Sequence, residues 1–322
     1  MLAMLWRHVM LALWSADVVL RPTLDRAGRI ARGLQAEVEI FSSVYEPDIV
    51  QPLESRELLE GRIAARVDEQ HRQLERLADQ LRDQGLKVRA SVRWDYPMFE
   101  GVVRQVLRHR PDLLIVPAIR ASDEMPRALA YREARLIETC PCPLLFLKTP
   151  EVYSAGSVVA AVDPLHAREM PRELDEAIIG AAKTVAYALA EAPVHIYHAV
   201  APLPRPAGGI PGAPSTSARE AARRATAEAP IREMALRHGI RGDCVRVELG
   251  VIETALPAFA REVRAQVMVM GAVSRSFPER ALFGHTAEKV LDALACDVLI
   301  VKPERFQSPV SVEPAPAMPR PT

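Results

Sequence analysis

Short runs of apolar residues alternate along the chain with longer segments in which apolar positions recur every three or four residues. The runs are almost continuous in Val, Ile and Leu, as in "DLLIVP" at 112–117 and "QVMVMG" at 266–271. Continuous apolar runs are typical of strands buried on both faces of a parallel sheet, and the longer segments have the period of amphipathic helices. The pattern therefore predicts an α/β fold with helices on both faces of a parallel sheet.

Ten such runs predict ten strands, five in each half of the chain. In the first half the predicted strands lie at 8–14, 36–43, 86–92, 112–117 and 143–148. In the second half they lie at 157–162, 193–200, 243–249, 266–271 and 297–302. The longest helical pattern extends from about Leu53 to Gln84. The last helices of the two halves have matching apolar stripes at Leu136, Ile137 and Cys140 and at Val290, Leu291 and Leu294.

The second half of the chain repeats the first. Pro117 aligns with Gly271 at an offset of 154 residues (271 − 117 = 154), and the same offset takes Lys148 to Lys302. The register holds without a gap from the end of the third strand to the last strand of each half. A repeat of this length indicates two tandem copies of one five-stranded, parallel-sheet, open α/β domain.

Chain length fits this organisation, because 322 residues suit two domains of roughly 150 residues each. We expect a first domain over 1–150, a second domain over 151–307 and a disordered tail over 308–322, which is too rich in Pro to build a core. A segment rich in Pro, Gly and Ser at 201–217 follows the second strand of the second copy. It is either a surface loop or a lid at the sheet edge where α/β proteins bind ligands.

The charge balance and the N-terminus bear on partners and compartment. Lys and Arg together number 41, as do Asp and Glu, so no global charge draws the protein to nucleic acid or to a membrane. The apolar stretch at 1–22 is interrupted by Arg7 and His8 and lacks a small-residue cleavage site. It therefore indicates a buried first strand rather than a signal peptide or a membrane helix. Without a targeting signal, we expect a cytoplasmic protein.

We expect no metal site. Four cysteines in a chain of this length do not form a disulfide framework. Cys140 and Cys142 have no second Cys/His pair nearby, so a structural role is favoured over metal binding or redox chemistry. His195 and His198 are three positions apart on a predicted strand, so they point to opposite faces and cannot chelate one ion together. We expect His198 to be a packed or hydrogen-bonded structural histidine.

The segment from 267 to 290 predicts a strand, a long loop and a helix. It contains Gly271, "AV", Ser274, "RSFPERALF", Gly284, His285 and Thr286. This string resembles the nucleotide loop of the universal stress protein family, in which a glycine, two residues, a second glycine and nine residues precede Gly-Ser and a small residue. The spacing is met, while Ser274 and His285 replace the second glycine and the serine. The tandem repeat, "YPMFEGVV" and the terminal string "GHTAEKVLDALACDVLIVKPERFQSPV" narrow the resemblance to E-type tandem members of bacteria, over about residues 5 to 312.

The resemblance implies Rossmann-like domains and a nucleotide site in the second of them. Asp163, at the end of that domain's first strand, would contact the adenosine part, and Val200 would line the same crevice. At Gly271 the missing side chain would let a ligand approach the backbone, and the start of the last helix would favour an anion. The predicted ligand-binding residues are Asp163, Val200, Gly271, Ser274, Arg275, Gly284, His285 and Thr286. A plain turn, ordinary helix capping and a solvated arginine are the alternatives at these positions.

The first copy has lost the motif. The offset of 154 places Pro117, Arg120, Ala130, Tyr131 and Arg132 at the motif positions, and Trp14 stands where the second copy has Asp163. Proline and bulky side chains would block the close backbone approach that phosphates require. We expect a structural first domain that binds no nucleotide in this way, with Trp14 in the volume that adenine would take.

These features predict a stress-response protein that binds ATP, another adenine nucleotide or a related phosphorylated small molecule in its second domain. No nucleophile–base pair or carboxylate dyad stands out, so we do not expect an enzyme. One alternative is a protein–protein interaction module in which both sites are degenerate. Another is a different phosphorylated or lipid-linked ligand held by Phe277, Leu282 and Phe283. We expect the two domains of the chain to pair, and protein partners and a homodimer stay open.

Overall fold

The computed structural model describes residues 6–14, 21–50, 55–118, 131–149, 153–164, 172–203, 215–272 and 285–313. They form two compact units. The first domain contains the described residues from Trp6 to Thr149 together with 305–313, and the second contains those from Tyr153 to Glu304. Each domain is described by itself below.

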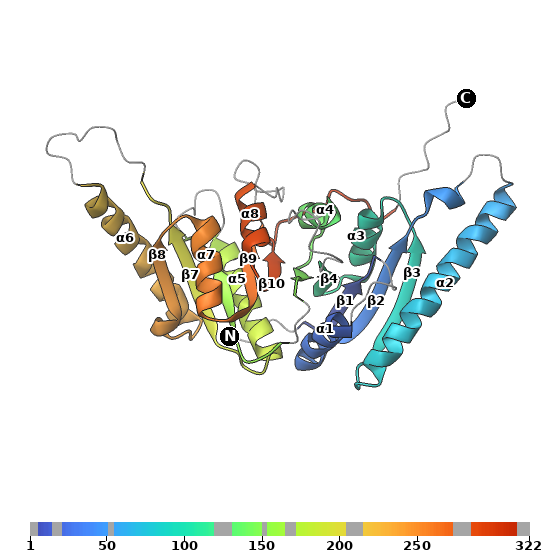
Figure 1. Ribbon diagram of the computed structural model, residues 1–322, viewed down its shortest axis with the longest axis horizontal. Helices are drawn as coiled ribbons and strands as arrows, with labels where there is room; N and C mark the ends of the chain where they lie inside the picture. The colour runs from blue at the N-terminus through green and yellow to red at the C-terminus, as the bar shows by residue number, and fades with distance from the viewer. Residues whose placement is uncertain are drawn as a thin grey trace, which may run out of the picture. The chain divides into compact units, whose positions relative to one another are not determined.

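The first domain has a parallel sheet with the strand order β3-β2-β1-β4-β5 (Figure 1). Its described strands are β1 (His8–Ala12), β2 (Glu37–Val44), β3 (Val88–Trp94), β4 (Leu113–Pro117) and β5 (Leu144–Leu147). Its described helices are α1 (Arg21–Leu34), η1 (Pro47–Ile49), α2 (Arg56–Arg82), α3 (Met98–His109) and α4 (Tyr131–Thr139). The order places β1 at the centre, as expected for the buried first strand that the N-terminal sequence predicted.

The second domain has the corresponding strand order β8-β7-β6-β9-β10, again parallel. Its described strands are β6 (Ser157–Ala161), β7 (Val194–Val200), β8 (Val245–Leu249), β9 (Ala265–Gly271) and β10 (Asp297–Val301). Its described helices are α5 (Arg172–Ala188), α6 (Thr216–Arg237), η3 (Gly242–Cys244), α7 (Ile252–Glu262) and α8 (His285–Ala293). All ten predicted strands are therefore confirmed, each within a few residues of its expected ends.

The helices confirm the register of the repeat. Helix α4 ends at Thr139 and α8 at Ala293, and the difference is 154 (293 − 139 = 154). Helices α3 and α7 likewise begin 154 residues apart, at Met98 and Ile252.

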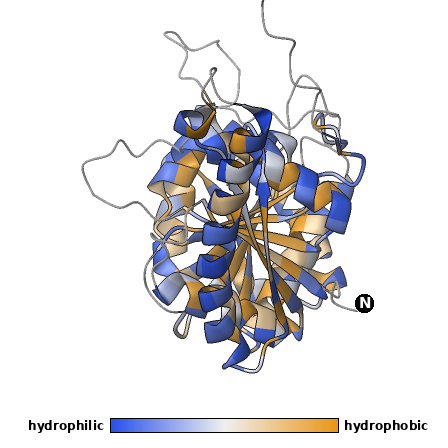
Figure 2. Ribbon diagram, turned by 90° about the vertical axis from the view of Figure 1, so that its right-hand side faces the viewer, coloured by the Kyte–Doolittle hydropathy of each residue, from blue (hydrophilic) through white to orange (hydrophobic). Residues whose placement is uncertain are grey.

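The core of each domain lies on the faces of its sheet. Strand positions such as Met10, Leu114, Val159 and Met268 are fully buried, and Figure 2 shows hydrophobic strands behind helices with hydrophilic residues on them. The long helix α2 has a narrow buried stripe, made by Gln70, Leu74, Ala78 and Leu81. Helices packed on both faces bury the inner strands, which is why β1 and β4 contain so little polar sequence, whereas the edge strand β3 is partly exposed.

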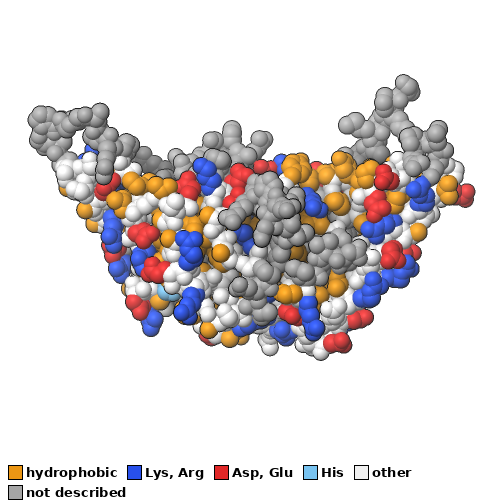
Figure 3. All heavy atoms as spheres, in the orientation of Figure 1, with side chains coloured by type: hydrophobic (Ala, Val, Ile, Leu, Met, Phe, Trp, Pro, Cys, Tyr) orange, Lys and Arg blue, Asp and Glu red, His pale blue; other side chains and the backbone are white. Residues whose placement is uncertain are grey.

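The surface carries charges of both signs. Figure 3 shows Lys and Arg side chains interspersed with Asp and Glu over the described surface, in keeping with the balanced composition. Among the described residues, no helix combines the length and the apolar character that a membrane span requires.

Part of the segment predicted to be a disordered tail is described. Residues 309–310 and 312–313 form bends. They lie with the first domain, where Arg108 Nη2 donates to the carbonyl oxygen of Val312 at 2.7 Å. The remaining residues, 314–322, lie outside the described part of the chain.

Candidate functional site

Three of the predicted ligand-binding residues lie at one edge of the second sheet. Strand β6 pairs with β7 on one side and with β9 on the other. Because the strands are parallel, their carboxyl ends meet at one edge. Asp163 lies two residues beyond β6, Val200 ends β7 and Gly271 ends β9.

The rest of the predicted loop is not described in the same detail. Ser274, Arg275 and Gly284 lie outside the described residues, as do the apolar loop residues Phe277, Leu282 and Phe283. His285 and Thr286 are the first two residues of α8, and only their backbone is described.

Asp163 is held through its backbone and keeps an accessible carboxylate. Its N–H group donates to Asp175 Oδ1 of α5 at 3.0 Å. Its side chain is 38% exposed, and its Oδ1 lies 3.8 Å from His198 Nδ1. A carboxylate in this position can accept hydrogen bonds from hydroxyl or amino groups of a ligand in front of the strand ends.

Asp175 is a member of this group that the sequence did not single out. Burial raises the pKa of Asp175 to about 6 from its ordinary 3.8. The hydrogen bond from the Asp163 N–H lowers this pKa, whereas the negative charges of Asp163 and Glu176 raise it further. Folding therefore favours the protonated acid. This contribution to stability is complete below the ordinary pKa of 3.8 and is lost as the pH rises through about 6.

The two histidines of β7 are on opposite faces, as predicted. The ring of His198 is buried, and its Nδ1 donates to the carbonyl oxygen of Val162 at 2.9 Å. The ring of His195 packs edge-on against Phe259 of α7, with 5.9 Å between the ring centroids. His198 is thus the packed, hydrogen-bonded histidine that the sequence predicted. No group of three His, Cys, Asp or Glu within the described residues could hold a metal ion.

Gly271 has a packing role that the sequence did not reveal. A Cβ atom there would lie 2.8 Å from Leu174 Cδ2 and 3.3 Å from Ile178 Cδ1, so the glycine lets α5 lie close to β9. Its φ is outside the left-handed region, so the positive φ that glycine permits is not used. Val200 is also a core residue, only 2% exposed. Direct contact of a ligand with Gly271 and Val200 stays a prediction. Because Gly271 has no side chain and the side chain of Val200 is buried, this contact would be made mainly by their backbone atoms.

The same edge of the first domain carries bulkier groups. Pro117 ends β4, and Trp14 lies two residues beyond β1, as Asp163 lies two beyond β6. The guanidinium carbon of Arg132 lies 4.9 Å from the centroid of the Trp14 ring and covers it. Tyr131, the first residue of α4, packs edge-on against Phe99. These contacts agree with a domain in which side chains occupy the ligand position.

Comparison with known proteins also distinguishes the two domains. The model of the universal stress protein family matches residues 160–302, from the last two residues of β6 through β10. Relatives named universal stress protein E align along both domains. The one from Escherichia coli K12 is 24% identical over 299 residues, with 91% of this chain and 93% of that protein covered. The second domain belongs to the universal stress protein family. The predicted resemblance to E-type tandem members is confirmed.

Further relatives and solved structures also align with both domains. The universal stress protein E homolog of Haemophilus influenzae is 22% identical over 306 residues, with 89% of this chain and 97% of that protein covered. A putative universal stress protein from Pseudomonas aeruginosa UCBPP-PA14 has a TM-score of 0.67 at 25% identity, over 93% of this chain and 94% of its own. A functionally unknown protein from Pseudomonas aeruginosa PAO1 has a TM-score of 0.68 at 24% identity, over 93% of each chain. They share the tandem α/β fold.

Proposed function

We propose that this protein is a cytoplasmic stress-response protein whose second domain binds an adenine nucleotide, ATP being the first candidate, or a related phosphorylated small molecule. The observation that carries this proposal is the accessible carboxylate of Asp163 at the carboxyl edge of β6. An acceptor there is suited to ribose hydroxyl or adenine amino groups. The first domain, with Trp14 at the matching place, is structural.

The start of α8 supports the phosphate end of this proposal. The unpaired N–H groups and the positive dipole end of a helix N-terminus favour an anion. The predicted loop, from Gly271 to Thr286, has the spacing of the family's nucleotide loop and connects the end of β9 to the start of α8 in the sequence. Asp163 and the start of α8 would then contact opposite ends of one nucleotide.

We propose binding rather than catalysis. The polar groups nearest Asp163 have structural duties, because Asp175 accepts the N–H of Asp163 and His198 donates to Val162. A general base needs a nitrogen or oxygen directed at the reacting group. Both side chains are also buried, which limits the access of a reacting group to their remaining oxygen and nitrogen.

Replacing Asp163 with alanine is expected to weaken ATP binding about tenfold or more, because a hydrogen bond to a charged group contributes about 1.5–3 kcal/mol. The measurement is calorimetric titration of the full chain. Asp243→Ala is the matched control, since it removes a carboxylate from the same domain at a side chain that is 67% exposed, in η3 before β8. An Asp163→Ala protein that binds ATP as tightly as the control contradicts the assignment. If neither these variants nor the unaltered protein binds any nucleotide, a protein–protein interaction module becomes the better explanation.

A further inference from the structure

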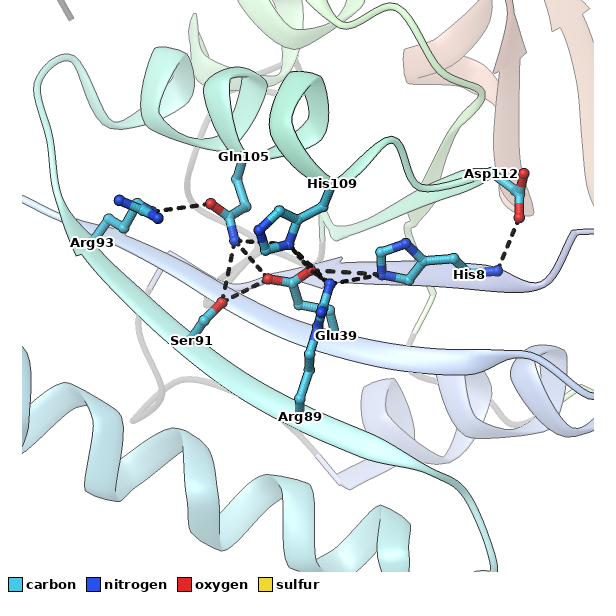
Figure 4. A network of polar contacts seen from close by, with 8 residues as sticks. All are labelled: His8, Glu39, Arg89, Ser91, Arg93, Gln105, His109 and Asp112. Atoms are coloured by element: carbon cyan, nitrogen blue, oxygen red, sulfur yellow. Dashed lines mark hydrogen bonds and ion pairs between the residues drawn. The ribbon is translucent and has the colours of Figure 1, made fainter. Parts of the chain in front are cut away.

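A buried carboxylate organises one side of the first domain. Glu39, in the middle of β2, has no exposed surface, and Figure 4 shows side chains from β1, β3 and α3 directed toward it. Its Oε1 accepts hydrogen bonds from Ser91 Oγ at 2.7 Å and Gln105 Nε2 at 2.6 Å. Its Oε2 accepts from Arg89 Nη2 at 2.6 Å and lies 2.7 Å from His109 Nδ1.

Glu39 is ionised in this environment. Burial by itself would raise its pKa, but the contacts with His8 and His109, followed by those with Ser91 and Gln105, hold the pKa well below its usual range. The carboxylate therefore acts as a fixed negative charge that orients the groups around it. Arg89 is held in place although its side chain is 56% exposed.

The oriented groups border a cavity of about 1040 Å³. It lies at the amino ends of β1, β2 and β3, which is the sheet edge opposite to Trp14 and Pro117. The basic residues that line it are Arg7, His8, Arg32, Lys87, Arg89 and His109. Arg7 precedes β1, Lys87 precedes β3 and Arg32 is in the last turn of α1.

The cavity is positively charged in a chain that has no net charge. Four Lys and Arg side chains line it, and Glu37 is the one carboxylate among the lining residues. Two more carboxylates lie behind the lining: Glu39 is paired with Arg89, and Asp112 accepts the N–H groups of Arg7 and His8, so the cations still exceed the carboxylates by one. Glu37 lies 3.2 Å from Lys87 in an exposed pair, and such pairs are weak. Within the described residues, Arg7 and Arg32 form no ion pair with a carboxylate, and Arg32 Nη1 donates to the neutral side chain of Gln84. Clefts lined by one sign of charge concentrate ligands of the opposite sign.

We propose that this cavity is a second ligand site, which binds a small phosphate-bearing molecule of at least two negative charges. Guanidinium groups match the oxygens of phosphate with two parallel hydrogen bonds, and three of the four permanent cations here are arginines. Small-molecule pockets have volumes of about 300–1000 Å³. The cavity is therefore large enough for an organic phosphate as well as for an inorganic ion. The Glu39 network keeps Arg89 in place before the ligand arrives, which lowers the entropy lost on binding.

The test is calorimetric titration of the full chain with inorganic pyrophosphate at low ionic strength. The double variant Arg7→Gln and Arg32→Gln removes two lining charges without touching the Glu39 network. We expect it to weaken pyrophosphate binding about tenfold or more. Arg56→Gln with Arg72→Gln is the matched control, since both arginines are exposed on α2, away from the cavity lining, and the change in net charge is the same. The control is expected to bind pyrophosphate like the unaltered protein.

Three results would overturn the proposal. They are the absence of pyrophosphate binding to the unaltered protein, an equal loss of affinity in the two double variants, and unchanged affinity in the Arg7/Arg32 variant. Citrate serves as a polyanion without phosphate. Citrate binding as tight as that of pyrophosphate would overturn the assignment to phosphate.

Discussion

Replacing Glu39 with glutamine is expected to lower the free energy of unfolding of the first domain by about 3 kcal/mol. The carboxylate accepts hydrogen bonds from Ser91, Arg89 and Gln105 and faces His109 in a site without solvent. Glutamine has one acceptor oxygen, and its NH₂ group would face other donors. Urea denaturation followed by circular dichroism measures the change in the first-domain transition.

Glu37→Gln provides the control, because Glu37 is two positions earlier on the same strand with a side chain that is 66% exposed. Its loss is expected to change stability by less than about 0.5 kcal/mol. If the Glu39→Gln and Glu37→Gln proteins had the same free energy of unfolding, the hydrogen bonds of Glu39 would not stabilise the fold.

The difference between the unaltered protein and Glu39→Gln is also expected to depend on pH. Because folding lowers the pKa of Glu39 below its ordinary 4.5, the carboxylate stabilises the fold above that value. The stabilisation declines as the pH falls below about 4.5 toward the lower folded pKa. A stability difference that stays constant from neutral pH into this acid range would contradict an ionised Glu39.

Replacing Gly101 with alanine is expected to destabilise the first domain by about 2 kcal/mol. Gly101 lies in the first turn of α3 against β2, where a Cβ atom would lie 2.2 Å from Ser43 Oγ and 2.9 Å from Ser43 Cβ. Asp95 Cβ would be 3.0 Å away on another side. Since two of these neighbours are Cβ atoms close to the backbone, relief requires a shift of α3 from the sheet. The same denaturation experiment measures the effect.

Gly61→Ala is the matched control and should have the opposite sign. Gly61 lies within α2, where an added Cβ atom would meet nothing within 4 Å. Alanine is favoured over glycine inside a helix by about 1 kcal/mol, so Gly61→Ala should stabilise the domain. If both alanine variants were stabilised alike, close packing at Gly101 would be refuted.

The sequence was sufficient to predict the strands and the tandem repeat. Runs such as 112–117 and 266–271 are apolar because both faces of their strands are covered, and this burial leaves a continuous pattern. The end of α8 at Ala293 also corresponds to the end of α4 at Thr139 at the offset of 154. These features depend on local composition and on comparison of the chain with itself.

The contacts that define Glu39 and Asp175 are not local. Glu37 and Glu39 look alike in "EVEI", and only the positions of β3 and α3, more than 48 residues further along the chain, leave one exposed and bury the other. Asp175 looks like an ordinary acid in the first turn of a helix. Its raised pKa follows from burial, with the charge of Asp163 acting in the same direction.

Gly271 illustrates a second limit of sequence-based inference. Either a ligand close to the backbone or a closely packed helix can require a glycine at a strand end. From the sequence, we interpreted Gly271 as a ligand-facing glycine. The contacts with Leu174 and Ile178 show that it also makes room for α5. Both requirements can act at one position, so the glycine alone does not identify the site.

The central claim is that only the second domain binds the nucleotide at the carboxyl edge of its sheet. The stoichiometry of ATP binding tests this claim most directly in the Arg7→Gln and Arg32→Gln chain, which lacks two of the cations of the cavity at the amino ends of β1, β2 and β3. Isothermal titration calorimetry on this full-length variant should give one ATP per chain, because the first domain has Trp14 and Pro117 where the second has Asp163 and Gly271. A stoichiometry of two per chain would contradict the structural role of the first domain. No binding at all would contradict the nucleotide site in the second.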